Sequence, residues 1–332
     1  MDASTATLNE PARYRSGDLV QVRTEGEILR TLDAEGRLEG LPFMPEMLRH
    51  CEQTVRVFKR AHKTCDSVWT TGLRRMEHTV FLQGLRCDGS AHGGCQAACL
   101  FFWKEQWLQP APSPSEPTGE SIGAAAEESG GGTLGGCTGE DLVRATRGGT
   151  VAGPERFSCQ ATEVARATLP LPSSNLRQYA DDIASGNVAI GHFARVVAGR
   201  LAERLAAGAR GRIRGGRKSA TRTRATPRVA ARLDLQPGDR VAIRSQPEIQ
   251  ATLDVRSRNR GLLFNEEMAL YCGGEFRVLG HVERIIHEPT GDMHDLRDCV
   301  ILEDVTCRGD FHRFCPRAVY PYWREAWLRK LE

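Results

Sequence analysis

Two short loops of the sequence combine thiols and an imidazole at matching spacing. Each follows the pattern C-x-G-x2-H-x2-C, and the glycine allows the tight turn that a small metal-binding loop needs. The ligand-type positions are Cys87, His92 and Cys95 in the first loop and Cys307, His312 and Cys315 in the second. Thiolate sulfur and imidazole nitrogen are the donors that zinc prefers in proteins, so each loop predicts a metal site.

One further cysteine in each half of the chain would complete a tetrahedral set. Cys51 precedes the first loop and Cys272 precedes the second, which gives three cysteines and one histidine per site, enough for structural zinc. The alternative is that Cys51 and Cys272 are ordinary buried thiols, since each is distant from its loop in sequence.

The first loop has an extra thiol that leaves a second composition open. Cys99 follows Cys95, whereas Val319 stands at the corresponding position of the second loop. A set of Cys87, Cys95 and Cys99 with either Cys65 or Cys159 would be all thiolate. Such a set would suit an iron–sulfur cluster as well as zinc, and the sequence does not decide between them.

Several histidines and acids lie close together in the second half of the chain. They are His281, His287, His294 and His312, with Asp292 and Asp295 among them. They could form a catalytic metal site with an open position. Because no H-E-x-x-H spacing occurs and Pro289 and Gly291 interrupt the segment, we favour an exposed hairpin loop.

The loops belong to a longer internal repeat. The segment Gly17–Asp33 matches Gly238–Asp254 at an offset of 221 residues, and the match continues through Glu46 and Glu267. After a one-residue slip it includes the paired tryptophans Trp103 and Trp107, then Trp323 and Trp327. The chain therefore holds two copies of a module of roughly 90 residues, a plausible domain size.

Each module begins with alternating apolar residues, which predicts short antiparallel strands. Val20 and Val22 alternate with the polar residues Gln21 and Arg23, and Val241 and Ile243 stand at the equivalent positions of the second module. A short helix or turn is expected over 41–50 and 262–271. The opening Gly-Asp and alternating valines resemble SH3-like barrels, which implies a small barrel for each module. The tryptophans at i and i+4 predict a terminal helix that plugs the barrel, with a stacking surface for bases or sugars as the alternative.

The expected fold is mainly β with some α: two tandem small SH3-like β-barrels that flank a helical hairpin. Apolar residues at helical spacing on either side of Ser185-Gly186-Asn187 predict the hairpin, packed on a module through Ile183, Ile190, Phe193 and Val197. The expected segments are a first metal-binding barrel over 14–109, a flexible Gly/Pro-rich linker over 110–155, the hairpin over 156–209, a basic connector over 210–232 and a second metal-binding barrel over 233–332.

Composition narrows the class of protein. The chain has 332 residues, 40% of them hydrophobic and 26% charged, and no apolar run long enough for a membrane span, so no membrane partner is expected. The first residues lack the apolar stretch of a secretory signal, which predicts a cytoplasmic protein. In that setting eleven cysteines point to metal ligation or buried thiols rather than disulfides.

Charge is unevenly distributed. The segment Arg195–Arg232 has twelve basic residues and one acid, although the net charge of the whole chain is only +3. The stretch from Arg210 to Arg232 could bind nucleic acid through phosphates, or it could be a disordered connector. Nucleotide-binding and kinase motifs are absent from the sequence.

The tandem loops and the W-x3-W-L pattern resemble uncharacterised bacterial proteins, and this resemblance implies no activity. We expect a metal-binding protein with structural zinc that acts as an interaction or scaffold protein for a protein or peptide partner. One alternative is a metalloenzyme or iron–sulfur protein of a specialised biosynthetic pathway, and another is a non-specific nucleic-acid binder. The sequence identifies no reaction, so whether the protein is an enzyme stays open.

Overall fold

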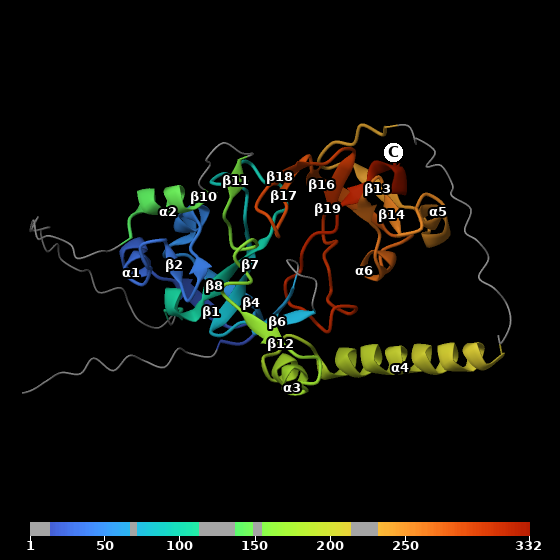
Figure 1. Cartoon of the computed structure of the whole chain (residues 1–332), viewed down its shortest axis with the longest axis horizontal. Coiled ribbons are helices and arrows are strands. Elements are labelled where there is room, and N and C mark those ends of the chain that lie inside the picture. Colours follow the sequence, from blue (N-terminus) through green and yellow to red (C-terminus); the bar gives the residue numbers. More distant parts are fainter. Residues whose placement is uncertain (1–13, 67–71, 113–136, 149–154, 214–231) are drawn as a thin grey trace, which may run out of the picture. The chain divides into compact units, whose positions relative to one another are not determined.

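A computed structural model describes residues 14–66, 72–112, 137–148, 155–213 and 232–332, without the side chains of 207–213 (Figure 1). The protein is mainly β with some helices, which is the coarse class that the alternating residues predicted. It divides into two compact units. The first contains Met1–Gly94, Leu100–Asn175 and His287–Met293, and the second contains Cys95–Cys99, Leu176–Ile286 and His294–Glu332.

The first unit is built on a curled, half-barrel sheet of five antiparallel strands in the order β8-β7-β4-β1-β9. Its strands are β1 (Leu19–Val22), β4 (Thr54–Arg60), β7 (Thr79–Arg86), β8 (Leu100–Lys104) and β9 (Leu108–Pro110). Val20 and Val22 are fully buried, as their alternation predicts. The register of β4 against β7 shifts between Val57 and Lys59, an irregularity of the kind that bends a sheet.

The second unit has a five-stranded sheet with equivalent strands in the same order, β20-β19-β16-β13-β21. Its strands are β13 (Arg240–Ile243), β16 (Glu275–His281), β19 (Cys299–Leu302), β20 (Trp323–Arg324) and β21 (Leu328–Lys330). The register of β16 shifts between Val278 and Gly280, at the position that corresponds to the shift in the first sheet. Both sheets therefore bend at the same point of the repeat.

The paired tryptophans form the centre of each core, but no α-helix carries them. Trp103 lies in β8, and Trp107 ends the short 3-10 turn η2 (Glu105–Trp107); η3 (Glu325–Trp327) is its equivalent in the second unit. All four indoles are fully buried. The expected terminal helix is wrong, because a strand followed by one turn also brings residues i and i+4 inward. Full burial also removes the stacking surface.

Short helices follow the first strand of each sheet and carry their own capping signals. Helix α1 (Glu25–Leu29) begins at Thr24, which forms a capping box with Glu27. Helix α5 (Gln246–Gln250) begins at Ser245 in the same way. The next helical segments are the 3-10 helix η1 (Pro45–His50) and helix α6 (Glu266–Ala269), within the ranges expected to be helical or turned. These two segments place an acidic residue beside each Cys–His loop.

Smaller elements complete the units. The short strands are β2 (Arg37–Leu38), β3 (Leu41–Pro42), β5 (Lys63–Cys65), β6 (Leu73–Arg75), β10 (Arg147–Gly148), β11 (Arg156–Phe157), β12 (Leu169–Leu171), β14 (Arg258–Asn259), β15 (Leu262–Leu263), β17 (Arg284–Ile286) and β18 (Met293–Asp295). Strand β12 extends the pair β5–β6 into a three-stranded sheet. Part of the segment expected to be the hairpin therefore pairs with the first module.

The stretch expected to be a flexible linker contains a helix in its described part. Helix α2 (Gly139–Ala145) begins at Thr138, whose hydroxyl accepts from the N–H of Asp141 in a capping box. The rest of that stretch over 113–136 and 149–154 lies outside the described residues, as does most of the basic connector, over 214–231. The expectations for those parts stay predictions.

The hairpin consists of helix α3 (Arg177–Ala184) and helix α4 (Ile190–Ile213), joined by a turn at Gly186, whose φ is +74°. Phe193 contacts the second module as expected, but Ile190 and Val197 are 68% and 46% exposed, so the packing predicted for them is wrong. No helix among the described residues is both long and apolar enough to cross a membrane.

Candidate metal centre

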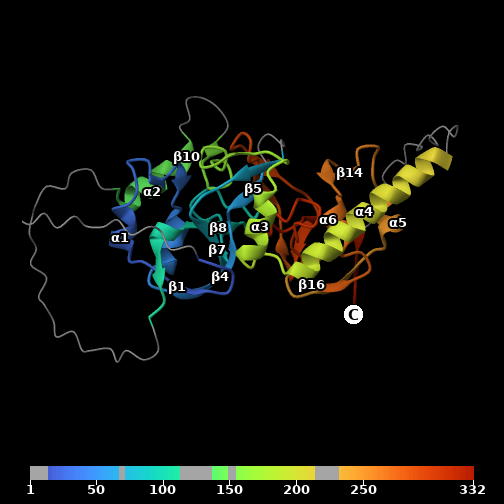
Figure 2. The ribbon, with the colours of Figure 1, turned by 90° about the horizontal axis from the view of Figure 1, so that it is seen from below.

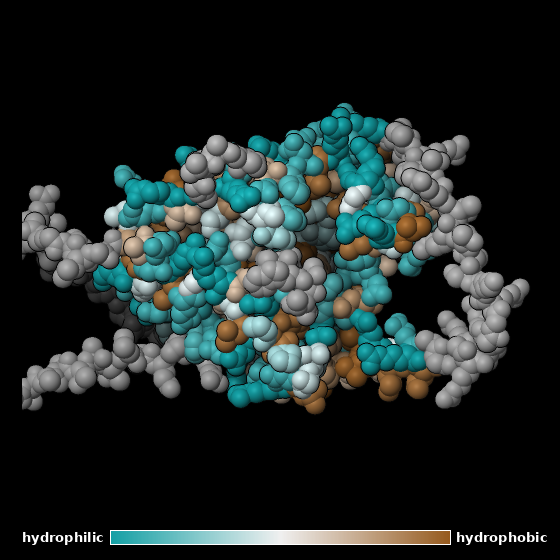
Figure 3. Space-filling view, in the orientation of Figure 1, coloured by the Kyte–Doolittle hydropathy of each residue, from teal (hydrophilic) through white to brown (hydrophobic). Residues whose placement is uncertain are grey.

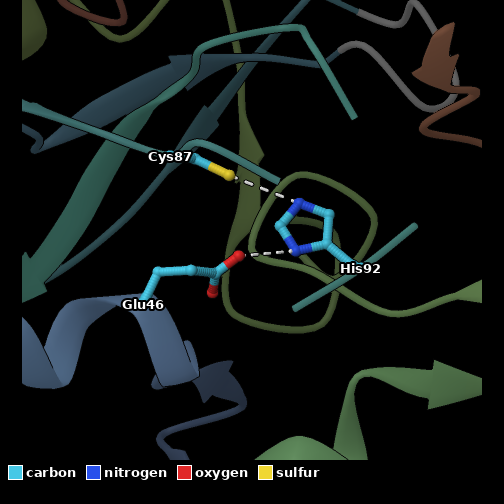
Figure 4. A group of neighbouring side chains, drawn as sticks. All are labelled: Glu46, Cys87 and His92. Carbon is cyan, nitrogen blue, oxygen red and sulfur yellow. Dashed lines mark hydrogen bonds and ion pairs between the residues drawn. The ribbon is translucent and has the colours of Figure 1, made fainter. Parts of the chain in front are cut away.

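The first unit brings one cysteine, one histidine and one glutamate together (Figure 4). Cys87 follows the last residue of β7, His92 lies in the loop after it, and Glu46 comes from η1. One potential ligand atom from each residue lies within 4.8 Å of the other two. The loop thus supplies two of the donors that its spacing predicted, and a distant segment supplies the third.

The imidazole lies between the thiol and the carboxylate. The Sγ of Cys87 lies 3.3 Å from Nε2 of His92, and Nδ1 of the same ring lies 3.1 Å from Oε1 of Glu46 (Figure 4). The side chains of His92 and Glu46 are both only 2% exposed. The ring therefore points at the thiol and not at solvent, as a ligand imidazole should.

Two polar atoms of this group lack a hydrogen-bond partner among the described residues. Nδ1 of His92 is close enough to Glu46 for an ion pair, but their geometry is not that of a hydrogen bond. Oε2 of Glu46 is also buried without a hydrogen-bond partner. Buried polar atoms are nearly always paired, so each such exception calls for an unseen water or ion. A metal ion would be one such partner, although a single ion binds only one of the two ring nitrogens of His92.

The carboxylate of Glu46 is held in its charged form. Burial raises the pKa of Glu46. The contacts with His92 and with the backbone N–H of Ala91 lower it by more, so the pKa lies below its ordinary value. The Ala91 N–H donates to Oε1 at 3.0 Å. A buried carboxylate in its charged form needs a charged or hydrogen-bonding partner close by, and His92 and the Ala91 N–H supply these partners here.

The backbone of the loop is shaped to support the thiol. The N–H of Gly89 donates to Sγ of Cys87 at 3.3 Å, a contact that stabilises a thiolate. Gly89 has a φ of +73°, in the left-handed region that glycine adopts at no steric cost. The equivalent Gly309 has a φ of +78°, and a Cβ there would approach the carbonyl oxygen of Cys315 to 2.6 Å.

The second unit repeats the group with Glu267, Cys307 and His312. Glu267 lies in α6 and is 3% exposed. Its Oε1 accepts from the N–H of Phe311 at 2.6 Å, and its Oε2 accepts from the N–H of Arg308 at 3.2 Å. Phe311 corresponds to Ala91 in the repeat, so the same backbone contact positions both carboxylates. His312 is less buried than His92.

The other predicted ligands lie outside these two groups. They are Cys51, Cys95, Cys99, Cys272 and Cys315. The Sγ of Cys95 is buried and accepts the N–H of Ile286 at 3.4 Å. Burial and the nearby Glu25 and Glu52 raise the pKa of Cys51 to about 11, and burial also raises the pKa of Cys272. These shifts favour the protonated thiol, which is the form that does not bind metal.

Of the histidines that lie close together in the second half, only His312 belongs to one of the two metal groups found among the described residues. His287 begins the turn between β17 and β18, where its N–H donates to the carbonyl of Asp292 at 2.8 Å. Its Nδ1 lies 3.0 Å from the hydroxyl of Thr290. These contacts are those of the hairpin loop that the sequence favoured.

Sequence reasoning missed the glutamates. Glu46 and Glu267 match in the repeat, and Glu46 stands in the apolar segment FMPEML, where an acid is out of place unless it has a partner. That mismatch was the available signal. Glu46 lies 41 residues before Cys87. Spacing alone gives no indication that two residues so far apart in the sequence will meet.

The arrangement supports two kinds of chemistry. Sulfur, nitrogen and oxygen donors at these separations can hold a zinc-like ion after small adjustments. Without a metal, the thiol lies at one nitrogen of the imidazole and the carboxylate at the other. This is the arrangement that activates nucleophilic thiols. Nδ1 of His92 and Oε2 of Glu46 lack a hydrogen-bond partner among the described residues, which leaves room for an ion or a water molecule beside them. Comparison of the chain with protein-family models, with curated proteins and with solved structures gave no match.

Proposed function

We propose that this protein is a tandem zinc-binding protein, with one ion in each module and a structural role for both. The observation that carries the proposal is the buried Glu46 beside His92 and Cys87, with one atom of Glu46 and one of His92 lacking a hydrogen-bond partner among the described residues. Cys87, His92 and Glu46 would hold the first ion, and Cys307, His312 and Glu267 the second. Bound zinc would tie the loop to η1 or α6 and add folding free energy to a small module.

Burial supports the structural role over a catalytic one. With His92 and Glu46 at 2% exposure, substrate would have little access to the ion in the first module. Three protein donors leave a fourth coordination position open, as in catalytic zinc sites. A metalloenzyme is therefore the second candidate, and its active site would be the group of the more accessible His312. Each group has a single thiol, which gives an all-thiolate iron–sulfur cluster less support.

The modules would then serve as rigid platforms for a protein or peptide partner in the cytoplasm. We propose SH3-like barrels as their finer fold, on the basis of five antiparallel strands in one order and the Gly-Asp opening. Nucleic-acid binding by the stretch from Arg210 to Arg232 stays a further candidate. Most of that stretch lies outside the described residues, so its support is the charge of the sequence alone.

The test is zinc stoichiometry of the full chain and of single variants. Cys87→Ser and Cys307→Ser should each reduce binding from two ions to one. Cys51→Ser is the matched control, since it removes a thiol of the same unit that lies outside the group, and it should keep two ions. Equal loss in Cys51→Ser would restore the thiol-rich set that the sequence favoured. Unchanged zinc content in all three variants would refute the site.

A further inference from the structure

The helical hairpin α3–α4 contacts the second Cys–His loop directly. Asp310 lies in that loop between Cys307 and His312, and its Oδ1 lies 2.7 Å from Nε2 of His192 in α4. The guanidinium of Arg200, two helical turns further on, donates to the carbonyl of Asp310 at 3.0 Å. The same guanidinium lies over the ring of Phe311, 4.1 Å from its centre. The helix therefore contacts the residues just before the histidine ligand.

Aromatic packing extends the contact to the other side of the histidine. Phe314 is buried, and its ring centre lies 5.2 Å from that of Phe193 and 6.4 Å from that of Tyr179 in α3. Phe314 adopts a φ of +60°, which is unusual for a bulky residue and implies that the surrounding contacts hold it there. The hairpin thus docks on a specific conformation of the loop.

The first loop cannot make these contacts. Ser90, Ala91 and Gly94 stand where the second loop has the three hairpin-contacting residues, whereas the cysteines, the glycine and the histidine are the same in both loops. The two copies therefore share the groups that would hold metal and differ where the hairpin binds. The difference assigns the hairpin to the second loop alone.

Helix α4 also has an exposed apolar stripe. Its members recur at helical spacing and are 68%, 46%, 57% and 67% exposed: Ile190, Val197, Leu201 and Leu205. Figure 3 shows apolar side chains along the lower edge of this helix, and Figure 2 shows its length from below. The contacts that His192 and Arg200 make with the loop come from the N-terminal half of the helix.

We propose that zinc at Cys307, His312 and Glu267 controls the docking of the α3–α4 hairpin, and that the hairpin in turn tightens zinc binding at this site. The inference rests on the proposed function. An ion that fixes Cys307 and His312 fixes the intervening Asp310 and Phe311, and so preserves the surface on which α4 docks. Loss of the ion would free the loop and release the helix with its apolar stripe and basic residues.

Linkage makes the proposal measurable from the helix side. If zinc favours docking by some factor, docking must raise zinc affinity by the same factor, typically 5- to 150-fold. Phe193→Ala and Arg200→Ala remove hairpin contacts without touching a proposed ligand. Each should weaken zinc binding at the second site about tenfold and leave the first site unchanged. Arg195→Ala is the matched control, because Arg195 is exposed on the same helix.

The experiment combines zinc competition with a chromophoric chelator and hydrogen exchange of the full chain with and without zinc. We expect the two helix variants to lose affinity at one site, and zinc to slow exchange over α3 and the first turns of α4. If zinc binds both sites but neither exchange nor affinity changes, the coupling is refuted and the zinc sites stand. If the unaltered protein binds no zinc, both the proposed function and the coupling are refuted.

Discussion

Replacing Glu46 with glutamine separates a metal site from a simple buried ion pair. The glutamine keeps the shape of the side chain and can still accept the Ala91 N–H through its Oε1. It removes the negative charge and the oxygen that lacks a hydrogen-bond partner among the described residues. The two accounts therefore predict a different dependence of the stability loss on zinc.

In zinc-free protein, both accounts expect the same effect, because the contact between His92 and Glu46 is present without an ion. Breaking this buried pair should cost about 3–5 kcal/mol of the free energy of unfolding of the first unit. A structural ion pair predicts the same loss with or without zinc, whereas the metal account predicts a further loss in zinc-loaded protein.

In zinc-loaded protein, the metal account expects a clear further loss. Removing a ligand or the group that orients a ligand histidine lowers metal affinity by at least about 10- to 100-fold. At saturating zinc that corresponds to about 1.4–2.7 kcal/mol of lost stabilisation. For a unit of this size the melting temperature should fall by roughly 3–10 °C.

The assay is calorimetry of Glu46→Gln and of the unaltered protein, each with excess zinc and after chelation, followed by zinc titration of both. Glu35→Gln is the control, an exposed carboxylate of the same unit. An equal loss of stability with and without zinc would refute the metal account and leave a structural ion pair.

Three further predictions concern the fold and the thiols. The indole N–H of Trp107 donates to the hydroxyl of Thr31 at 3.1 Å inside the core, so Thr31→Val should cost about 1–3 kcal/mol in urea unfolding, while exposed Thr54→Val should cost little. Gly309→Ala should destabilise the second unit by more than Gly261→Ala in thermal melts, because both have positive φ but only Gly309 lacks space for a Cβ. Burial raises the pKa of Cys51 and of Cys299 to about 11 each, so mass-resolved alkylation at pH 8 should be slow at both and should accelerate as the pH approaches 11; rapid alkylation of either in folded protein at pH 8 would contradict the burial.

The sequence predicted those parts of the molecule that depend on local pattern. Alternation located the first strand of each sheet, and the C-x-G-x2-H spacing located two residues of each Cys–His–Glu group. Spacing within a loop does not decide where each side chain points, and Cys95 instead accepts a backbone N–H from Ile286. The missing donor came from a helical segment that only the fold brings near, which is why Glu46 escaped the sequence pattern.

Other differences come from signals with more than one structural meaning. The i, i+4 tryptophans fit an α-helix, but a strand with a 3-10 turn satisfies the same spacing. Helix α2 lies in a stretch whose overall composition is that of a linker, although Thr138 and Asp141 provide a capping box. Helix α4 has more apolar residues than it buries. Phe193 and Arg200 contact the loop, so their face of the helix packs and the apolar residues on the other faces stay exposed.

The most direct test of the central claim is elemental analysis of the purified full chain together with its absorption spectrum. The account predicts about two zinc ions per chain, one for each Cys–His–Glu group, and a colourless protein. Iron and sulfide with absorption near 400 nm, or a folded protein with no bound metal, would contradict it.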